Sequence, residues 1–223
     1  MVFVSPELAR IRTRFEHILN DQEDFILSLP YVCKKQDDKS VFLRITQRER
    51  LCEIAFVILF TAWEQFLESA FEISVVDARL SSIKSRHNVL VVDLGTAHDL
   101  IRGGQRYVDW ADPNTVRTRA KVFFKNGEPF ESALSAVSGD VTKMRIIRNR
   151  CVHFSQHADE QYQKIIREIV GSGRRISPGK LLFNSPPDGL SSASNTETYE
   201  TVFQFYAAVL ATASAQIVPE KRK

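Results

Sequence analysis

Apolar residues recur every three or four positions along most of the chain, and this spacing is typical of amphipathic α-helices. The first apolar series begins after Ser5 and Pro6, which suit the cap and the first position of a helix. It continues at helical spacing until Pro30, a residue that cannot extend a helix. The pattern therefore predicts a first helix between these residues.

A long helix that forms the spine of the domain is expected next. Thr46 and Glu49 have the spacing of a capping box, and apolar positions continue from there to near Val76. They form two seams, so other helices must cover two sides of this one. The longest unbroken apolar run, residues 54–63, is about half of the roughly 20 residues that cross a membrane. We therefore expect a bundle around a long central helix and no membrane association.

Later apolar series predict further helices, whose ends are marked by Gly, Pro, Asn and Asp. These helices are expected to run from Asp112-Pro113 to Asn126-Gly127, around residues 130–137, over residues 141–154 after Gly139-Asp140, over residues 158–170 before Gly171, and from a Ser194 and Glu197 cap to Ile217. Residues 80–99 stay open between a short strand at 89–93 and a helical turn capped by Thr96. Residues 171–195, rich in Pro, Ser and Gly, predict a long loop.

These elements predict one domain over residues 1–223 with an all-α fold. The expected architecture is an up-and-down helical bundle with a four-helix-type core and extra short helices. The composition agrees, because 43% hydrophobic and 26% charged residues is ordinary for globular proteins. Cys33, Cys52 and Cys151 are isolated, which supports neither a disulfide framework nor a cysteine zinc site. With no basic and apolar leader at the start, the sequence favours a cytoplasmic protein.

Residues 141–154 carry the candidate chemistry. One stripe is apolar and is expected to face the core: Met144, Ile147, Cys151 and Phe154. The other side carries Arg145, Asn149 and His153 at successive steps of four, with Arg148 on its flank. Two β-branched apolar residues lie among these polar ones. We therefore expect this polar side to meet either a partner subunit or a ligand cleft.

Arg148 and Asn149, with His153 separated from the arginine by four residues, resemble the defining motif of the HEPN superfamily: Arg, four to six residues, then His, often with Asn after the Arg. The helical plan and Trp63-Glu64 on the long second helix are also similar, in particular to the branch associated with RiboL-PSP domains. The resemblance implies a HEPN-like bundle that forms a homodimer, so that two motifs line one cleft. It also implies a metal-independent endoribonuclease of toxin, defence or RNA-processing systems, with an antitoxin or another partner protein.

The residue types fit this chemistry independently of the resemblance. RNA is cut when its 2′-hydroxyl attacks the adjacent phosphate, which requires a base and positive charge at the phosphate oxygens. An imidazole such as that of His153 titrates near neutral pH and suits the base. Arg148 offers a forked donor to phosphate, and Asn149 could orient the imidazole or bond a phosphate oxygen. The expected products are a 2′,3′-cyclic phosphate and a 5′-hydroxyl, and neither a metal nor a cofactor is needed.

Other residues give weaker signals. Arg12 and His17 have the same spacing as the motif, but Thr13 follows the arginine, and we interpret the pair as a solvated helix face. The net charge is only +3 although Lys and Arg number 30, so RNA contacts must come from local patches. The weaker candidates for RNA binding are Arg145, Arg117, Arg119, Lys121, Lys125 and Arg106. A solvated basic face is the alternative for the residues near Phe123 and Phe124.

Two alternatives to catalysis stay open. In one, the cluster at 148–153 belongs to a non-catalytic HEPN-like module that holds RNA, a nucleotide or a partner helix. In the other, the protein is a plain helical dimer whose polar cluster fixes the register of the interface. The sequence carries no information on the RNA substrate, because a base and an arginine recognise phosphate chemistry and not base identity.

Overall fold

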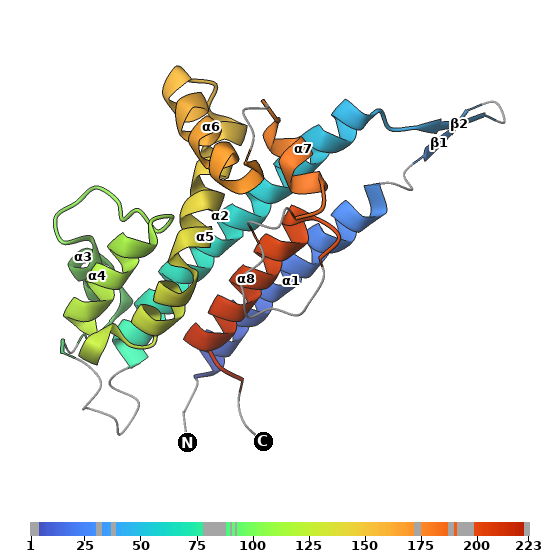
Figure 1. Ribbon diagram of the computed structural model, residues 1–223. Helices are drawn as coiled ribbons and strands as arrows, with labels where there is room; N and C mark the ends of the chain where they lie inside the picture. The colour runs from blue at the N-terminus through green and yellow to red at the C-terminus, as the bar shows by residue number, and fades with distance from the viewer. Residues whose placement is uncertain are drawn as a thin grey trace. The chain divides into compact units, whose positions relative to one another are not determined.

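The part of the chain that the structure describes is almost entirely helical (Figure 1). The computed structural model describes residues 5–29, 33–36, 39–77, 88–89, 91, 93–171, 175–186, 190 and 199–220. In chain order its elements are α1 (Pro6–Ser28), β1 (Cys33–Gln36), β2 (Lys39–Phe42), α2 (Ile45–Asp77), α3 (Leu94–Arg102), α4 (Pro113–Phe123), the 3₁₀ turn η3 (Lys125–Gly127), α5 (Phe130–Val152), α6 (Gln156–Val170), α7 (Pro178–Phe183) and α8 (Val202–Ile217). The predicted all-α class and helical bundle are confirmed.

The chain divides into two compact units. The first contains Met1–His17, Thr61–Thr142 and Val209–Lys223, and the second contains Ile18–Phe60 and Lys143–Ala208. The helices α1, α2, α5 and α8 each contribute residues to both units. The candidate motif at residues 148–153 belongs to the second unit.

The first unit has an aromatic core. The ring of Phe71 lies 4.9 Å from that of Phe130, 5.2 Å from that of Phe124 and 5.5 Å from that of Trp110, measured between centroids. All four side chains are buried. Because an aromatic pair adds about 0.5–1.5 kcal/mol beyond its buried area, this cluster fixes the ends of α4 and α5 against α2.

The second unit is organised around the first half of α2. Phe56 packs against Phe203 and Tyr206 of α8, with ring centroids 6.2 and 6.1 Å apart. The short helix α7 lies against the opening turns of α2, where Ser177 Oγ donates to Glu49 Oε2 at 2.9 Å. The Gly179 N–H donates to Glu53 Oε1 at 3.1 Å in a buried hydrogen bond.

Gly179 allows this close approach of two helix backbones. A Cβ atom built there would lie 2.2 Å from the Glu49 carbonyl oxygen and 2.6 Å from its carbonyl carbon. No side chain fits at such distances, and backbone atoms cannot rotate away. The helix α7 can therefore dock on α2 only with glycine at this position.

Several predicted helix ends are confirmed. Ser5 Oγ accepts the Leu8 N–H at 3.3 Å as α1 begins, and Asp112 accepts the Asn114 and Thr115 N–H groups as α4 begins. Gly171 ends α6 in the left-handed conformation, with φ at 66°, which favours glycine. These ends depend on side chains adjacent in sequence, which explains why the sequence predicts them.

Other predicted ends are wrong by a few residues. The helix α2 begins at Ile45, so Thr46 lies inside it, and the Arg44 N–H donates to the Gln47 side chain at 2.9 Å. Thr96 does not cap a helix, because Asp93 accepts its N–H at 2.9 Å and caps α3. The predicted strand at 89–93 lies partly outside the described residues.

Two predictions of a break or a loop are wrong. Gly139 was expected to end a helix, but α5 continues through it to Val152. Glycine costs only about 1 kcal/mol in a helix, and the buried apolar residues on both sides of it outweigh that cost. The expected loop at 171–195 contains α7, which a Ser177 cap and Pro178 begin.

The last helix begins later than predicted. The Ser194 and Glu197 cap lies outside the described residues, whereas α8 starts at Val202. Here Thr201 and Gln204 form the capping box: each side chain accepts the other residue's N–H, at 3.2 and 3.1 Å. The strands β1 and β2 pair as an antiparallel hairpin, with Cys33 opposite Phe42 in the register.

By length and composition, residues 45–76 of α2 could cross a membrane, with a mean hydropathy of 1.4 in the most apolar stretch. Of that stretch, 56% is buried inside the structure. Core helices of soluble proteins have the same property, so this helix carries no conclusion about localisation.

Candidate functional site

The last turn of α5 carries the predicted motif. Met144 and Ile147 are fully buried and anchor this turn to the core of the second unit. Because α5 ends at Val152, His153 is the first residue after the helix, and its N–H still donates to the Asn149 carbonyl oxygen at 2.8 Å. His153 is exposed. The motif therefore ends with an accessible imidazole on a backbone that the helix holds.

Arg148 is fixed by two neighbours. One guanidinium nitrogen, Nη1, donates to Asn149 Oδ1 at 3.0 Å. The guanidinium carbon lies 5.4 Å from the ring centroid of Phe60, which is fully buried. A cation over an aromatic face is attracted by about 0.5–2 kcal/mol, depending on burial. Both contacts reduce the conformational freedom of Arg148 before any substrate arrives.

The structure assigns Asn149 a different contact from the one that was expected first. Its amide oxygen accepts a hydrogen bond from Arg148, so this contact orients the arginine and not the imidazole. An amide whose oxygen is occupied still has two N–H donors, which can bond a phosphate oxygen. The half-buried Arg145 lies one turn earlier on the same helix. Arg148 and Asn149 are in direct contact, and His153 follows one turn later.

A pocket of about 310 Å³ adjoins the end of α5. It is lined by Arg50 and Glu53 of α2, Arg150 and Phe154 at the end of α5, Asp159, Tyr162 and Gln163 of α6, and residues 175–178 at the start of α7. We call it the Phe154 pocket. The sequence does not predict this pocket, because its walls come from four segments far apart in the chain.

Phe154 itself corrects a prediction. It was expected to continue the apolar stripe of Met144 and Ile147, but it is 74% exposed. The reason is that α5 ends before it, so the helical spacing no longer determines its direction. The Arg50 and Arg150 guanidinium carbons lie 5.9 and 5.8 Å from the Phe154 ring centroid.

Carboxylates neutralise part of the positive charge in the Phe154 pocket. Arg50 Nη1 pairs with Glu53 Oε2 at 2.7 Å. Arg150 Nε pairs with Asp159 Oδ1 at 3.0 Å. Arg175 is an exposed third arginine on the rim. Three arginines against two carboxylates leave the lining with one formal positive charge.

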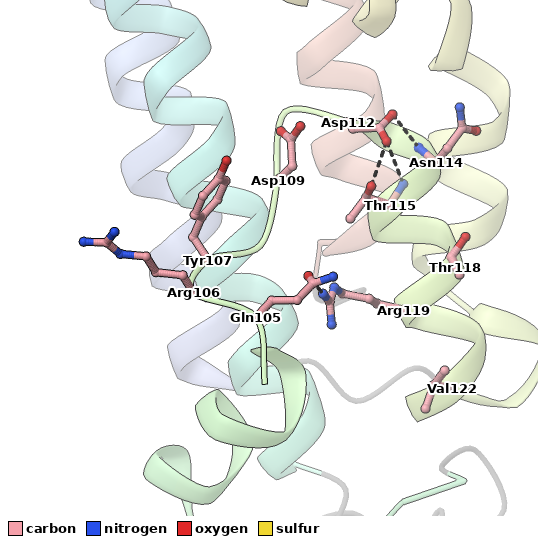
Figure 2. Close-up of a pocket in the computed structure, with 10 residues that line it drawn as sticks. All are labelled: Gln105, Arg106, Tyr107, Asp109, Asp112, Asn114, Thr115, Thr118, Arg119 and Val122. Carbon is pink, nitrogen blue, oxygen red and sulfur yellow. Dashed lines mark hydrogen bonds between the residues drawn. The ribbon is translucent and has the colours of Figure 1, made fainter. Parts of the chain in front are cut away.

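A second pocket lies in the first unit, between α4 and the loop that joins α3 to α4. It has a volume of about 820 Å³ and includes Arg106 and Arg119, two of the weaker RNA-binding candidates (Figure 2). Arg119 is engaged, because its guanidinium donates to the Ile101 carbonyl oxygen and to the Gln105 side chain. Figure 2 shows Arg106 pointing away from Arg119, next to Tyr107, which is 73% exposed. Most of the residues that line this pocket have polar side chains.

The remaining basic candidates near this pocket divide into two kinds. Arg117 donates to both carboxylate oxygens of Glu131, at 2.6 and 3.1 Å, and Lys121 lies 3.3 Å from the same carboxylate. The hydrogen bond from Arg117 lowers the pKa of Glu131 and raises its own. Lys125 is exposed. The alternative of an ordinary structural basic face fits Arg117 and Lys121, whose charges are partly neutralised.

The second Arg-and-His pair, Arg12 and His17, is built differently from the motif. Arg12 was expected to be solvated, but its side chain is only 13% exposed. Its guanidinium pairs with Glu16 at 2.6 Å and donates to the Val218 carbonyl oxygen at 2.9 Å. These contacts give Arg12 a structural role that connects α1 to the chain after α8.

No protein-family model, no curated protein and no solved structure matches this chain. Across the described residues, no group of three or more His, Cys, Asp or Glu side chains is arranged to hold a metal ion. The geometry around the end of α5 is therefore the basis for a proposal about function.

Proposed function

We propose that the protein is a metal-independent endoribonuclease of the HEPN type. The observation that carries this proposal is the arrangement at the end of α5. There, Asn149 and Phe60 hold the Arg148 guanidinium one turn before the exposed imidazole of His153. An immobilised cation and an accessible base are two of the groups that catalyse RNA transesterification.

The reaction follows from the chemistry of these groups. His153 removes the proton from a 2′-hydroxyl, whose oxygen then forms a bond to the adjacent phosphorus. Arg148 donates to the non-bridging oxygens as negative charge accumulates on them. The bond from phosphorus to the 5′-oxygen breaks, and that oxygen takes up a proton. The products are a 2′,3′-cyclic phosphate and a 5′-hydroxyl.

The proposal includes a homodimer in the cytoplasm. In a HEPN-like dimer two motifs share one cleft, so the His153 of one copy can remove the proton while that of the other protonates the leaving oxygen. The broader role proposed is a toxin or defence protein, with an antitoxin or another protein as partner. The basic residues Arg106, Arg145 and Lys125 are proposed as further contacts to the RNA backbone.

The test is cleavage of a mixed pool of RNA in EDTA. Replacing the base or the cation, His153→Ala or Arg148→Ala, is expected to lower the rate at least about 100-fold. His17→Ala is the matched control, because it removes the exposed histidine of the other Arg-and-His pair, and it is expected to leave the rate unchanged.

Circular dichroism of each variant checks that its fold is intact. Activity that survives both substitutions would refute the assignment of the site. RNA that is bound but never cut by folded wild-type protein would instead favour the non-catalytic module.

A further inference from the structure

Phe154 is an unusual side chain to find exposed beside a charged pocket. Its ring is 74% exposed, and the guanidinium groups of Arg50 and Arg150 lie within 6 Å of its centroid. These contacts hold the ring at the pocket without burying it. An exposed aromatic face next to arginines is the usual surface on which single-stranded bases stack, at about 1–3 kcal/mol per base.

Tyr162 provides an independent observation inside the same pocket. It is only 1% exposed, and its hydroxyl has no hydrogen-bond partner among the described residues. A buried hydroxyl without a partner is unfavourable, so a polar group that reached it from the pocket would supply the missing hydrogen bond. Burial raises the pKa of Tyr162, so the phenol stays neutral and can both donate and accept.

The charge and size of the pocket narrow the ligand class. Two of its arginines are paired with Glu53 and Asp159, and Arg175 remains on the exposed rim as a cation. The lining therefore favours one anionic group. Its volume of about 310 Å³ lies at the small end of the range for small-molecule sites. An aromatic face, a buried hydroxyl and one net positive charge match a base and a phosphate.

We infer that the Phe154 pocket binds one nucleotide of the RNA, next to the phosphate that is cut. The base stacks on Phe154, a polar edge of the nucleotide bonds the Tyr162 hydroxyl, and Arg175 contacts a phosphate. Phe154 directly follows His153 in the chain, so their Cα atoms are about 3.8 Å apart and a nucleotide on this ring lies one residue from the imidazole. This inference rests on the proposed function and adds a subsite that recognises a base.

Isothermal titration calorimetry tests the inference. It measures how the four nucleoside 5′-monophosphates bind to the full chain carrying His153→Ala. Saturable binding of at least one nucleotide is expected. Tyr162→Phe removes only the hydroxyl and should weaken binding about twofold to tenfold. Arg175→Ala should weaken it about tenfold. Arg167→Ala, which removes an exposed arginine of α6 outside the pocket, is the control and should leave binding unchanged.

Inorganic phosphate is the second probe, and it should bind at least tenfold more weakly than the best nucleotide. Equal binding of phosphate and nucleotides would overturn base recognition. Absence of nucleotide binding to the folded protein, or equal losses in the Arg167 variant, would overturn the pocket assignment.

Cleavage by the otherwise wild-type protein distinguishes the two proposals. Tyr162→Phe should raise KM for RNA more than it lowers kcat, because the hydroxyl contacts substrate away from the reacting atoms. An active enzyme without nucleotide binding refutes the subsite alone. A protein that binds nucleotides through Tyr162 but never cuts RNA refutes the nuclease and leaves a nucleotide-binding pocket.

Discussion

Replacing Gly179 by alanine separates two effects of opposite sign. Helix propensity alone predicts that alanine within α7 stabilises the protein, by about 1 kcal/mol relative to glycine. The structure predicts the reverse, because the new Cβ would lie 2.2 Å from the Glu49 carbonyl oxygen, where ordinary contact begins at 3.4 Å. The helix α7 must therefore move away from α2 by about 1 Å.

The magnitude follows from what that movement strains. Overpacking of this kind costs about 1–3 kcal/mol. The movement also lengthens the buried hydrogen bond from the Gly179 N–H to the Glu53 carboxylate, and a bond to a charged group contributes about 1.5–3 kcal/mol. After the gain in helix propensity is subtracted, Gly179→Ala should lower the free energy of unfolding by about 1.5–5 kcal/mol.

Urea denaturation followed by circular dichroism measures this change, with Gly139→Ala as the matched control. Gly139 lies inside α5, and a Cβ there would have no described atom within 4 Å apart from the neighbouring backbone of its own helix. That variant should therefore stabilise the protein by about 1 kcal/mol. If Gly179→Ala were as stable as the wild type or more stable, the close docking of α7 on α2 would be refuted.

Three further predictions concern charge and burial. Because Arg117 lowers the pKa of Glu131, the unfolded chain binds more protons than the folded one in acid, so this contribution to stability is complete above the ordinary carboxyl pKa and is lost as pH falls below it. The urea midpoint of the wild type should therefore exceed that of Glu131→Gln at pH 7, and the two midpoints should become similar at pH 3. The same difference between the two proteins at both pH values would contradict the ion pair. Burial raises the pKa of Cys151 to about 12 and raises that of Cys52 as well, so both thiols should resist iodoacetamide at pH 8 in the folded protein and react in urea; rapid native alkylation of either would contradict their burial. Arg148→Lys keeps the charge but loses the forked donor, so it should retain less than about a tenth of the cleavage rate, and full activity would show that the fork is unnecessary.

The helix ends that the sequence predicts well have local causes. Asp112 caps the helix that begins beside it, and Gly171 ends α6 because the left-handed conformation suits glycine. A break at Gly139 was wrong for a tertiary reason, because residues on both sides are buried and carry the helix through. Local signals predict ends only where packing agrees with them.

The site was predictable only in part. The spacing of Arg148, Asn149 and His153 along one helix could be read from the sequence, but the contact between Arg148 and Phe60 could not. The Phe154 pocket depends on α2, α6 and α7 meeting the end of α5, and this requires glycine at 179, whose role is invisible in sequence. Arg12 shows the converse, since a motif-like spacing conceals a structural ion pair.

Analysis of the new RNA ends by mass spectrometry tests the central claim most directly. A single-stranded RNA incubated in EDTA with wild-type protein should yield fragments that end in a 2′,3′-cyclic phosphate and begin with a 5′-hydroxyl. The His153→Ala protein, folded and at the same concentration, should yield none. Fragments with 5′-phosphate ends, or the same cyclic ends from the variant, would contradict an imidazole-driven attack by the 2′-hydroxyl.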